Sequence, residues 1–74
     1  MPVVHVYVFE RKTLEQKRKI VAGITQAMVE GAGTDAKEVH VILHDTSIAD
    51  WANGGVLYSE NSTYLEKRKR LETP

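Results

Sequence analysis

The chain has 74 residues, 42% of them hydrophobic and 27% charged, and this length permits one small globular domain. Ten Lys and Arg residues balance ten Asp and Glu residues, so the sequence has no net charge to attract nucleic acid or an acidic membrane surface. It contains no cysteine, no signal-peptide pattern and no apolar run near the roughly 20 residues that span a bilayer. We therefore expect a cytoplasmic protein.

The first expected element is a β-strand over residues 3–9, which read Val-Val-His-Val-Tyr-Val-Phe. β-Branched and aromatic residues dominate this segment, and Val4, Val6 and Val8 fall on one face at period two.

A helix is expected to begin near Leu14. Thr13 and Gln16 form the capping-box pattern, which satisfies free amides at a helix start. Apolar residues follow at spacings of three and four, which predicts one apolar stripe: Ile20, Val21, Ile24, Ala27, Met28 and Gly31. Gly31 and Gly33 are expected to end the helix.

A turn is expected over residues 34–37. A second strand is expected over residues 39–44, and the turn-forming residues 45–47 follow it. A helical crossover joins parallel strands, almost always with right-handed geometry. The start of the second strand therefore lies at the same sheet edge as Pro2, which predicts that His40 lies near Pro2.

The C-terminal part carries weaker patterns. After a loop over residues 48–53, Gly54-Gly55 and residues 56–58 predict an edge strand or a hairpin. The basic run Lys67-Arg68-Lys69-Arg70 is interpreted as a solvated terminal segment or as a helix that caps a neighbouring molecule. We divide the chain into a domain over residues 1–58 and a tail over residues 59–74.

These elements predict an α/β fold built on one β-α-β unit. Two parallel strands and one helix leave one sheet face uncovered and both sheet edges open. Two such units paired about a two-fold axis would form a four-stranded sheet, and further copies would cover its other face. We therefore expect a homo-oligomer, a dimer at minimum.

Pro2 is the first candidate catalytic residue. Removal of Met1 would expose a secondary amine, and an α-amino group titrates near pH 8 when its surroundings do not perturb it. Burial and nearby cations disfavour the charged form, which brings the pKa closer to neutrality, where general-base catalysis works best.

Several segments together resemble the 4-oxalocrotonate tautomerase family: Met-Pro before a valine-rich strand, residues 10–17, a single helix, Val39-His40-Val41-Ile42, and Trp51 before Gly54-Gly55. The resemblance implies a small β-α-β chain in a hexamer built as a trimer of dimers. It further implies an isomerase that needs no cofactor. In such an enzyme Pro2 is the general base that moves a proton on a 2-hydroxydienoate or a similar small enol acid.

The family commonly has Gly-Arg before the helix cap, and that arginine binds a substrate carboxylate; here Arg11 and Lys12 occupy the two positions. Lys12 keeps the positive charge but lacks the planar fork that grips a carboxylate through two parallel bonds. The anchor is therefore either Lys12 or Arg11. Lys12 lies roughly 25 Å or more along the chain from Pro2, so the cation beside Pro2 must come from another subunit.

The resemblance assigns substrate-binding roles to two further residues. His40 stands where well-known members have a second arginine, although some relatives have histidine, and its neutral imidazole would donate a hydrogen bond to the substrate oxygen. A structural hydrogen bond of this histidine is the alternative. Trp51 stands where the family has an aromatic residue that lines the pocket, and simple packing is its alternative role.

Other activities fit the sequence less well. His40 and His44 share a strand face but lie roughly 13 Å apart, too far for one metal ion. A dehalogenase or hydratase of the same superfamily would need a carboxylate beside the proline; Asp50 is the candidate, although Asn53 stands where such a residue would be wanted. A non-catalytic oligomeric binding module is the third alternative, because the Gly-Arg pair is altered.

Overall fold

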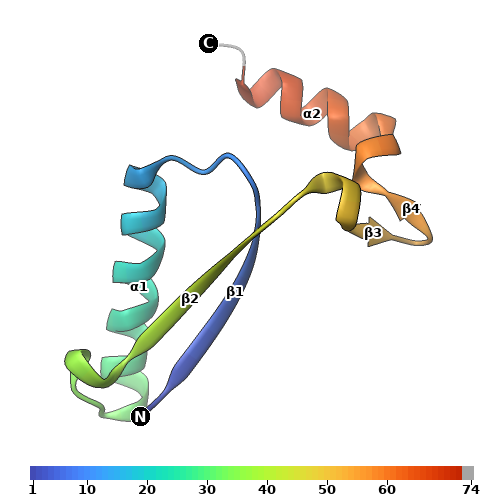
Figure 1. The fold of residues 1–74 in the computed structure, drawn as a ribbon. Helices are drawn as coiled ribbons and strands as arrows, with labels where there is room; N and C mark the ends of the chain where they lie inside the picture. The colour runs from blue at the N-terminus through green and yellow to red at the C-terminus, as the bar shows by residue number, and fades with distance from the viewer. Residues whose placement is uncertain (73–74) are drawn as a thin grey trace.

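A β-α-β unit forms the body of the protein. In the computed structural model, which describes residues 1–72, strand β1 (Val3–Phe9) runs parallel to strand β2 (His40–Thr46). Helix α1 (Leu14–Ala32) connects the two strands and lies along one face of the sheet they form (Figure 1). The predicted fold class, a β-α-β unit with parallel strands, is confirmed.

Local signals define both ends of α1. The hydroxyl of Thr13 accepts a hydrogen bond from the backbone N–H of Gln16 (3.1 Å), and the Gln16 side chain accepts one from the backbone N–H of Thr13 (2.8 Å). At the other end Gly33 adopts a left-handed conformation (φ 65°) and donates to the carbonyl of Val29 (3.1 Å). The predicted capping box and the predicted end at Gly33 are therefore confirmed, whereas Gly31 lies within the helix.

Strand β2 begins one residue later and ends two residues later than the sequence indicated. Asp45 and Thr46 were expected in a turn, but they pair with Val8 and Phe9 and continue the parallel ladder. The ammonium of Lys17 on α1 lies 3.0 Å from the Asp45 carboxylate, which ties the start of the helix to the end of the strand. A tertiary contact thus outweighs the turn preference of Asp45.

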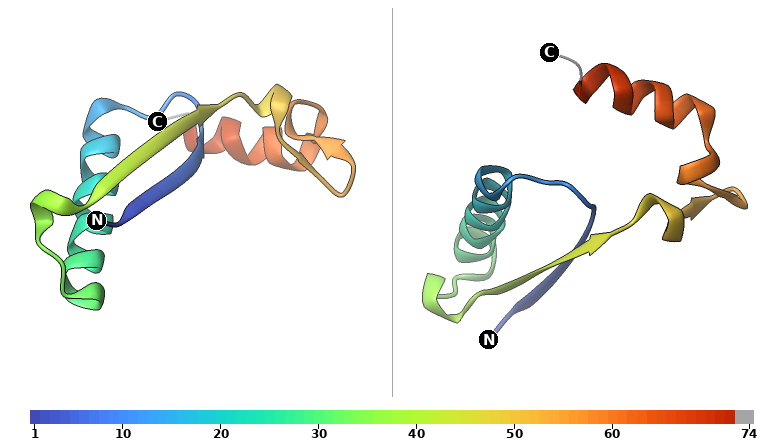
Figure 2. Two further views of the ribbon diagram at one scale, coloured as in Figure 1. Left: turned by 60° about the horizontal axis from the view of Figure 1, so that its bottom comes forward. Right: turned by 45° about the horizontal axis from the view of Figure 1, so that its top comes forward.

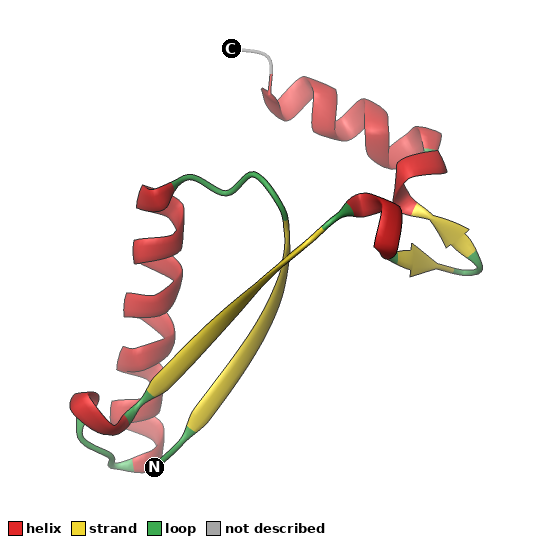
Figure 3. Ribbon diagram, in the orientation of Figure 1, coloured by secondary structure: helices red, strands yellow, loops and turns green. Residues whose placement is uncertain are grey.

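The C-terminal part extends beyond the end of β2 (Figure 2). Of the two predicted alternatives, an edge strand or a hairpin, the structure shows a short hairpin of β3 (Ala52–Asn53) and β4 (Val56–Leu57), and β3 lies in the segment that was expected to be a loop. The turn of the hairpin uses positive φ at Gly54 and Gly55. Helix α2 (Ser62–Glu72) follows (Figure 3). Of the two interpretations of the tail, the helix is therefore observed, while contact with a neighbouring molecule and the division at residue 58 stay predictions.

Four aromatic rings join this C-terminal part to the end of β1. Phe9 meets Trp51, Tyr58 and Tyr64 edge to face, with ring centroids 4.7, 5.2 and 5.2 Å apart. Tyr58 and Tyr64 stack on each other at 4.9 Å. Such contacts are worth about 0.5–1.5 kcal/mol each beyond the area they bury, so they hold the hairpin and α2 against Phe9.

No side chain of residues 1–70 is fully buried in the isolated chain. Val4, Val6 and Val8 alternate with exposed residues along β1 and are only half-buried. On the alternate positions, which lie on the opposite sheet face, Val3 is 52%, Tyr7 62% and Ile42 43% exposed. An exposed apolar sheet face of this kind indicates a surface that another protein covers.

Among residues 1–72, neither helix α1 nor helix α2 is long and apolar enough to cross a membrane.

Candidate active site

Pro2 and His40 lie together at one end of the sheet. The backbone N–H of His40 donates a hydrogen bond to the carbonyl of Pro2 (3.0 Å), and the first ladder pair is Val3 with His40. The predicted proximity of His40 to Pro2 is therefore confirmed. Pro2 is half-buried and His40 is exposed, so solvent or a substrate can reach this end of the sheet.

Arg11 and Lys12 lie at the opposite end, in the connection between β1 and α1. Strand β1 is seven residues long, and a rise of about 3.3 Å per residue separates its ends by about 20 Å. One chain therefore does not bring these cations to its own Pro2. The structure divides the predicted site residues into two groups, one at each end of β1.

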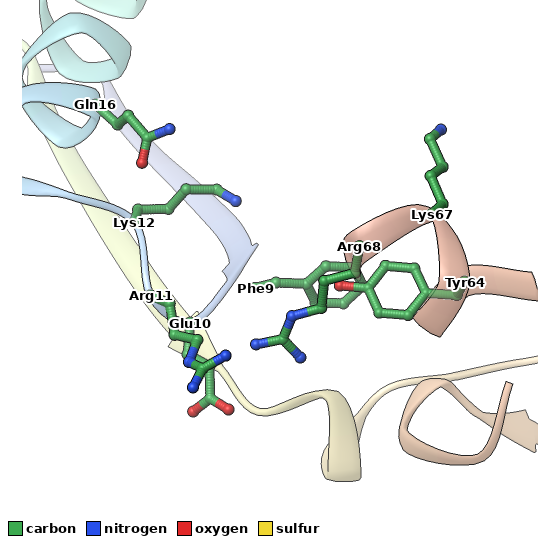
Figure 4. A pocket seen from close by; sticks show the side chains of 8 residues that line it. All are labelled: Phe9, Glu10, Arg11, Lys12, Gln16, Tyr64, Lys67 and Arg68. Atoms are coloured by element: carbon green, nitrogen blue, oxygen red, sulfur yellow. The ribbon is translucent and has the colours of Figure 1, made fainter. Parts of the chain in front are cut away.

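A cavity of about 570 Å³ opens at the end that carries Arg11 and Lys12 (Figure 4). The β1–α1 connection forms one wall and helix α2 the other. The lining residues are Phe9, Glu10, Arg11, Lys12, Gln16, Tyr64, Lys67 and Arg68. Four cationic side chains and one carboxylate make this cavity strongly positive, although the whole chain has no net charge. The arrangement suits a small acid.

Trp51 is near this cavity but is not among the residues that line it. Its ring packs against Phe9, which does line the cavity, and its carbonyl accepts a hydrogen bond from the Tyr58 N–H (2.8 Å). Within one chain Trp51 therefore contacts the cavity wall through Phe9 and does not line the cavity itself. Asp50, the candidate for the dehalogenase alternative, precedes it in the short turn Ile48–Asp50, also at the end of the sheet away from Pro2.

The sequence predicted two of the eight lining residues, Arg11 and Lys12, and missed the other six, of which Tyr64, Lys67 and Arg68 come from α2. The basic run over residues 67–70 was the available signal, but it was interpreted as solvated or as contacting another molecule. Lys67 and Arg68 line the cavity, whereas Lys69 and Arg70 do not.

The backbone distinguishes Arg11 from Lys12. Arg11 has φ 77° and is the only non-glycine residue with positive φ among residues 1–72. The left-handed region costs a residue with a side chain roughly 1–2 kcal/mol, whereas glycine enters it freely. Arg11 thus occupies a turn position that favours glycine. In the Gly-Arg pair that the resemblance described above implies, this is the glycine position.

We therefore expect Arg11→Gly to raise the free energy of unfolding by up to about 1 kcal/mol, because it relieves this conformation. Thermal unfolding of the otherwise identical protein measures the effect. Lys12→Gly is the matched control: it adds the same flexibility where φ is not positive, so it should lower the melting temperature. An Arg11→Gly protein that melts below the unmodified one would show that contacts of the arginine side chain outweigh the backbone cost.

Comparisons with known proteins show which proteins this chain is similar to. The family described as "Tautomerase enzyme" matches residues 2–61. A probable tautomerase of Ralstonia nicotianae is 47% identical over 60 residues, which cover 81% of this chain and 92% of that protein. The 2-hydroxymuconate tautomerase of Comamonas testosteroni is 33% identical, with 81% and 95% covered. A solved 4-oxalocrotonate tautomerase isozyme of Methylibium petroleiphilum superposes with a TM-score of 0.77 at 37% identity, over 80% of this chain and 95% of that one.

Proposed function

The chain belongs to the 4-oxalocrotonate tautomerase family and is a tautomerase, and from this premise we propose that Pro2, freed by removal of Met1, is its general base. The observation that carries the proposal is the match to the family, which begins at Pro2 itself and extends past Trp51 to residue 61. The ladder pair at the start of β1, which sets His40 beside Pro2, supports it further.

The proposed substrate is a small 2-hydroxydienoate or a similar enol acid. Relatives 33% and 30% identical to this chain are 2-hydroxymuconate tautomerases, and the cationic cavity suits a carboxylate. The neutral amine of Pro2 would take the proton of the enol hydroxyl, and the ammonium that forms would return a proton to carbon to give the keto acid. His40 would donate a hydrogen bond to the substrate oxygen as charge develops there.

Lys12 is the proposed carboxylate anchor, because Arg11 occupies the glycine-like turn position. Its ammonium lies at the end of β1 away from its own Pro2, so the proposed site combines Pro2 and His40 of one chain with the cavity of another. Trp51 would keep the apolar wall of that cavity in place. We propose a hexamer, a dimer at minimum; a related 4-oxalocrotonate tautomerase of Chloroflexus aurantiacus is a heterohexamer.

The test is ketonisation of 2-hydroxymuconate, followed by ultraviolet absorbance, with the Met1-free protein. We expect turnover, and we expect Lys12→Ala to raise KM roughly 10- to 150-fold, because a charge-assisted hydrogen bond worth about 1.5–3 kcal/mol is lost. Arg11→Ala should change KM less.

Three outcomes would contradict parts of this proposal. Unchanged KM and kcat in both single variants and in the double variant would make Arg11 and Lys12 ordinary surface charges. Release of halide from a halogenated acrylate, without ketonisation, would favour the dehalogenase alternative. Binding of the enol acid without turnover would favour a binding module.

A further inference from the structure

We propose that a histidine pair, His5 and His44, makes the association of this chain with its own copies depend on pH. The copies associate while the two rings share a hydrogen bond, and they separate when both rings carry a proton. This inference rests on the oligomer of the proposed function, because it takes the exposed sheet face that carries the pair as a contact between copies. Neither histidine has a role in the proposed catalytic site.

The two rings come from neighbouring strands of the sheet. His5 lies on β1 and His44 on β2, and Nδ1 of His5 lies 2.9 Å from Nε2 of His44. Tyr7 is directly opposite His44 in the ladder, and their rings stack with centroids 4.4 Å apart and 13° between the planes. This stacking holds the ring of His44 where it meets His5.

The contact between the two rings limits how many protons the pair can carry. A hydrogen bond between two imidazoles needs one nitrogen that carries a proton and one that does not. The pair therefore keeps the bond with both rings neutral or with one ring protonated. A second proton would leave two N–H groups facing each other across 2.9 Å, with a positive charge on each ring. The hydrogen bond would then be lost, and the two charges would repel each other.

The sheet face around the pair has no carboxylate to compensate two such charges. Alternate positions of the two strands make up this face: Val3, His5, Tyr7 and Phe9 on β1, and His40, Ile42, His44 and Thr46 on β2. Besides the pair, its titratable groups are the phenol of Tyr7 and the imidazole of His40. The carboxylate of Asp45 belongs to the other face, where it pairs with Lys17 of α1.

Further charged groups lie beyond Phe9, in the cavity that this residue also lines. They are Glu10, Arg11, Lys12, Lys67 and Arg68. Carboxylates ordinarily titrate below pH 5 and lysine and arginine above pH 10, so histidine is the residue type that changes its charge between pH 7.5 and 5.5.

A second copy of this chain is the partner that fits the exposed sheet face. Helix α1 lies along the other face (Figure 1), while Val3, Tyr7 and Ile42 stay exposed on this one. The proposed active site already requires residues of two copies, and a related 4-oxalocrotonate tautomerase is a heterohexamer. A face of uncharged residues can pack against the same face of a copy. With both rings protonated, each copy would bring two positive charges into that contact, and burial would remove the water that solvates them.

The separated chain therefore binds one more proton per pair than the assembled chain, so a fall in pH favours separation. An unperturbed imidazole titrates near pH 6.5. Exclusion of one proton from such a group raises the dissociation constant about tenfold at pH 5.5, once for each pair in the contact.

Sedimentation of the Met1-free full chain, from nanomolar to micromolar concentration, tests this inference at pH 7.5 and pH 5.5. We expect the dissociation constant to be at least about tenfold higher at pH 5.5. His5→Gln should remove most of this rise, because an amide does not titrate and its oxygen accepts a hydrogen bond from the remaining ring. Circular dichroism checks the fold at both pH values, and His44→Gln provides a second test if His5→Gln does not fold.

His40→Gln is the matched control. It removes a histidine from the same sheet face, but this residue pairs with Val3 in the ladder and not with the histidine pair, so the rise should persist. An oligomer that stays equally assembled at both pH values would overturn the inference. A full rise in folded His5→Gln, or in His44→Gln if His5→Gln does not fold, would do the same, as would loss of the rise in His40→Gln.

The same measurements separate this inference from the proposed function. If the oligomer forms at pH 7.5 and is unchanged at pH 5.5, the role of the histidine pair is wrong and the shared site stands. If the chain is a monomer at pH 7.5 and micromolar concentration, the proposed oligomer itself is wrong. Ketonisation at pH 7.5 tests the role of Pro2 independently of both.

Discussion

Retention of Met1 should reduce kcat for enol ketonisation by a factor of about 10² to 10⁴, the usual contribution of a general base. In the Met1-retaining chain the Pro2 nitrogen is a tertiary amide, which has no basic lone pair to accept the substrate proton. Met1 is 85% exposed in the isolated chain, so the extra residue has room and the fold should be unchanged. Chains synthesised with and without Met1, verified by intact mass, allow the comparison.

Two controls distinguish loss of the base from loss of structure. Pro2→Ala in the Met1-free chain keeps a primary amine, so it should retain more activity than the Met1-retaining chain. The pH dependence of kcat/KM is the second control. The ammonium cannot accept a proton, so kcat/KM of the unmodified enzyme should rise with pH as the amine becomes neutral. An unperturbed α-amino group would place this rise near pH 8, and cations from a neighbouring subunit would shift it lower.

Equal turnover by the two chains, each confirmed by mass and by its oligomeric state, would show that Pro2 is not the base. A profile without any rise between pH 6 and about 9 in the Met1-free enzyme would lead to the same conclusion.

Features that depend on neighbouring residues were predicted well. The Thr13–Gln16 capping box and the left-handed Gly33 need only a few residues of sequence, and both appear as expected. The parallel crossover followed from the strand–helix–strand order and correctly set His40 beside Pro2.

Features that depend on distant contacts were not predicted. Asp45 continues β2 by pairing with Val8, and its carboxylate forms an ion pair with the ammonium of Lys17. Neither partner is near Asp45 in the sequence. His44 was considered only with His40, yet its Nε2 lies 2.9 Å from Nδ1 of His5 on the adjacent strand, a contact that only the strand register reveals. Sequence spacing alone supplies no register.

The candidate site shows the same contrast. Pro2, Arg11, Lys12 and His40 come from segments with recognisable patterns, so their positions at the two ends of β1 could be derived. Arg68 belongs to a polar helix with no clear apolar face, and contacts between residues far apart in the sequence, such as Tyr64 with Phe9, bring that helix to the cavity. The basic run over residues 67–70 is evident in the sequence, but the sequence does not show which surface of the protein lies next to it.

Because the site residues lie at the two ends of β1, we expect a second large effect: two variants that are each defective should recover activity when they assemble together. In the shared-site arrangement, a Met1-retaining chain has a blocked Pro2 but an intact Lys12, and a Lys12→Ala chain has the reverse defect. Random co-assembly of equal amounts should make about a quarter of the sites fully intact, because each site draws Pro2 from one chain and Lys12 from another. Light scattering at micromolar concentration should first show an oligomer.

The recovery is measured as the rate of ketonisation at a substrate concentration well below KM. At this concentration the raised KM of the Lys12→Ala chain makes its own rate low. The two proteins are unfolded and refolded together. In the control sample they are refolded separately and then mixed, so their subunits do not exchange and activity should not recover. A site contained in one chain predicts no gain in either sample, because every chain in the mixture carries one of the two defects. Absence of recovery in verified mixed oligomers, or full activity in a monomer, would therefore contradict the shared site. The exposed face that carries Val3, Tyr7 and Ile42 would then need another explanation than contact between copies of this chain.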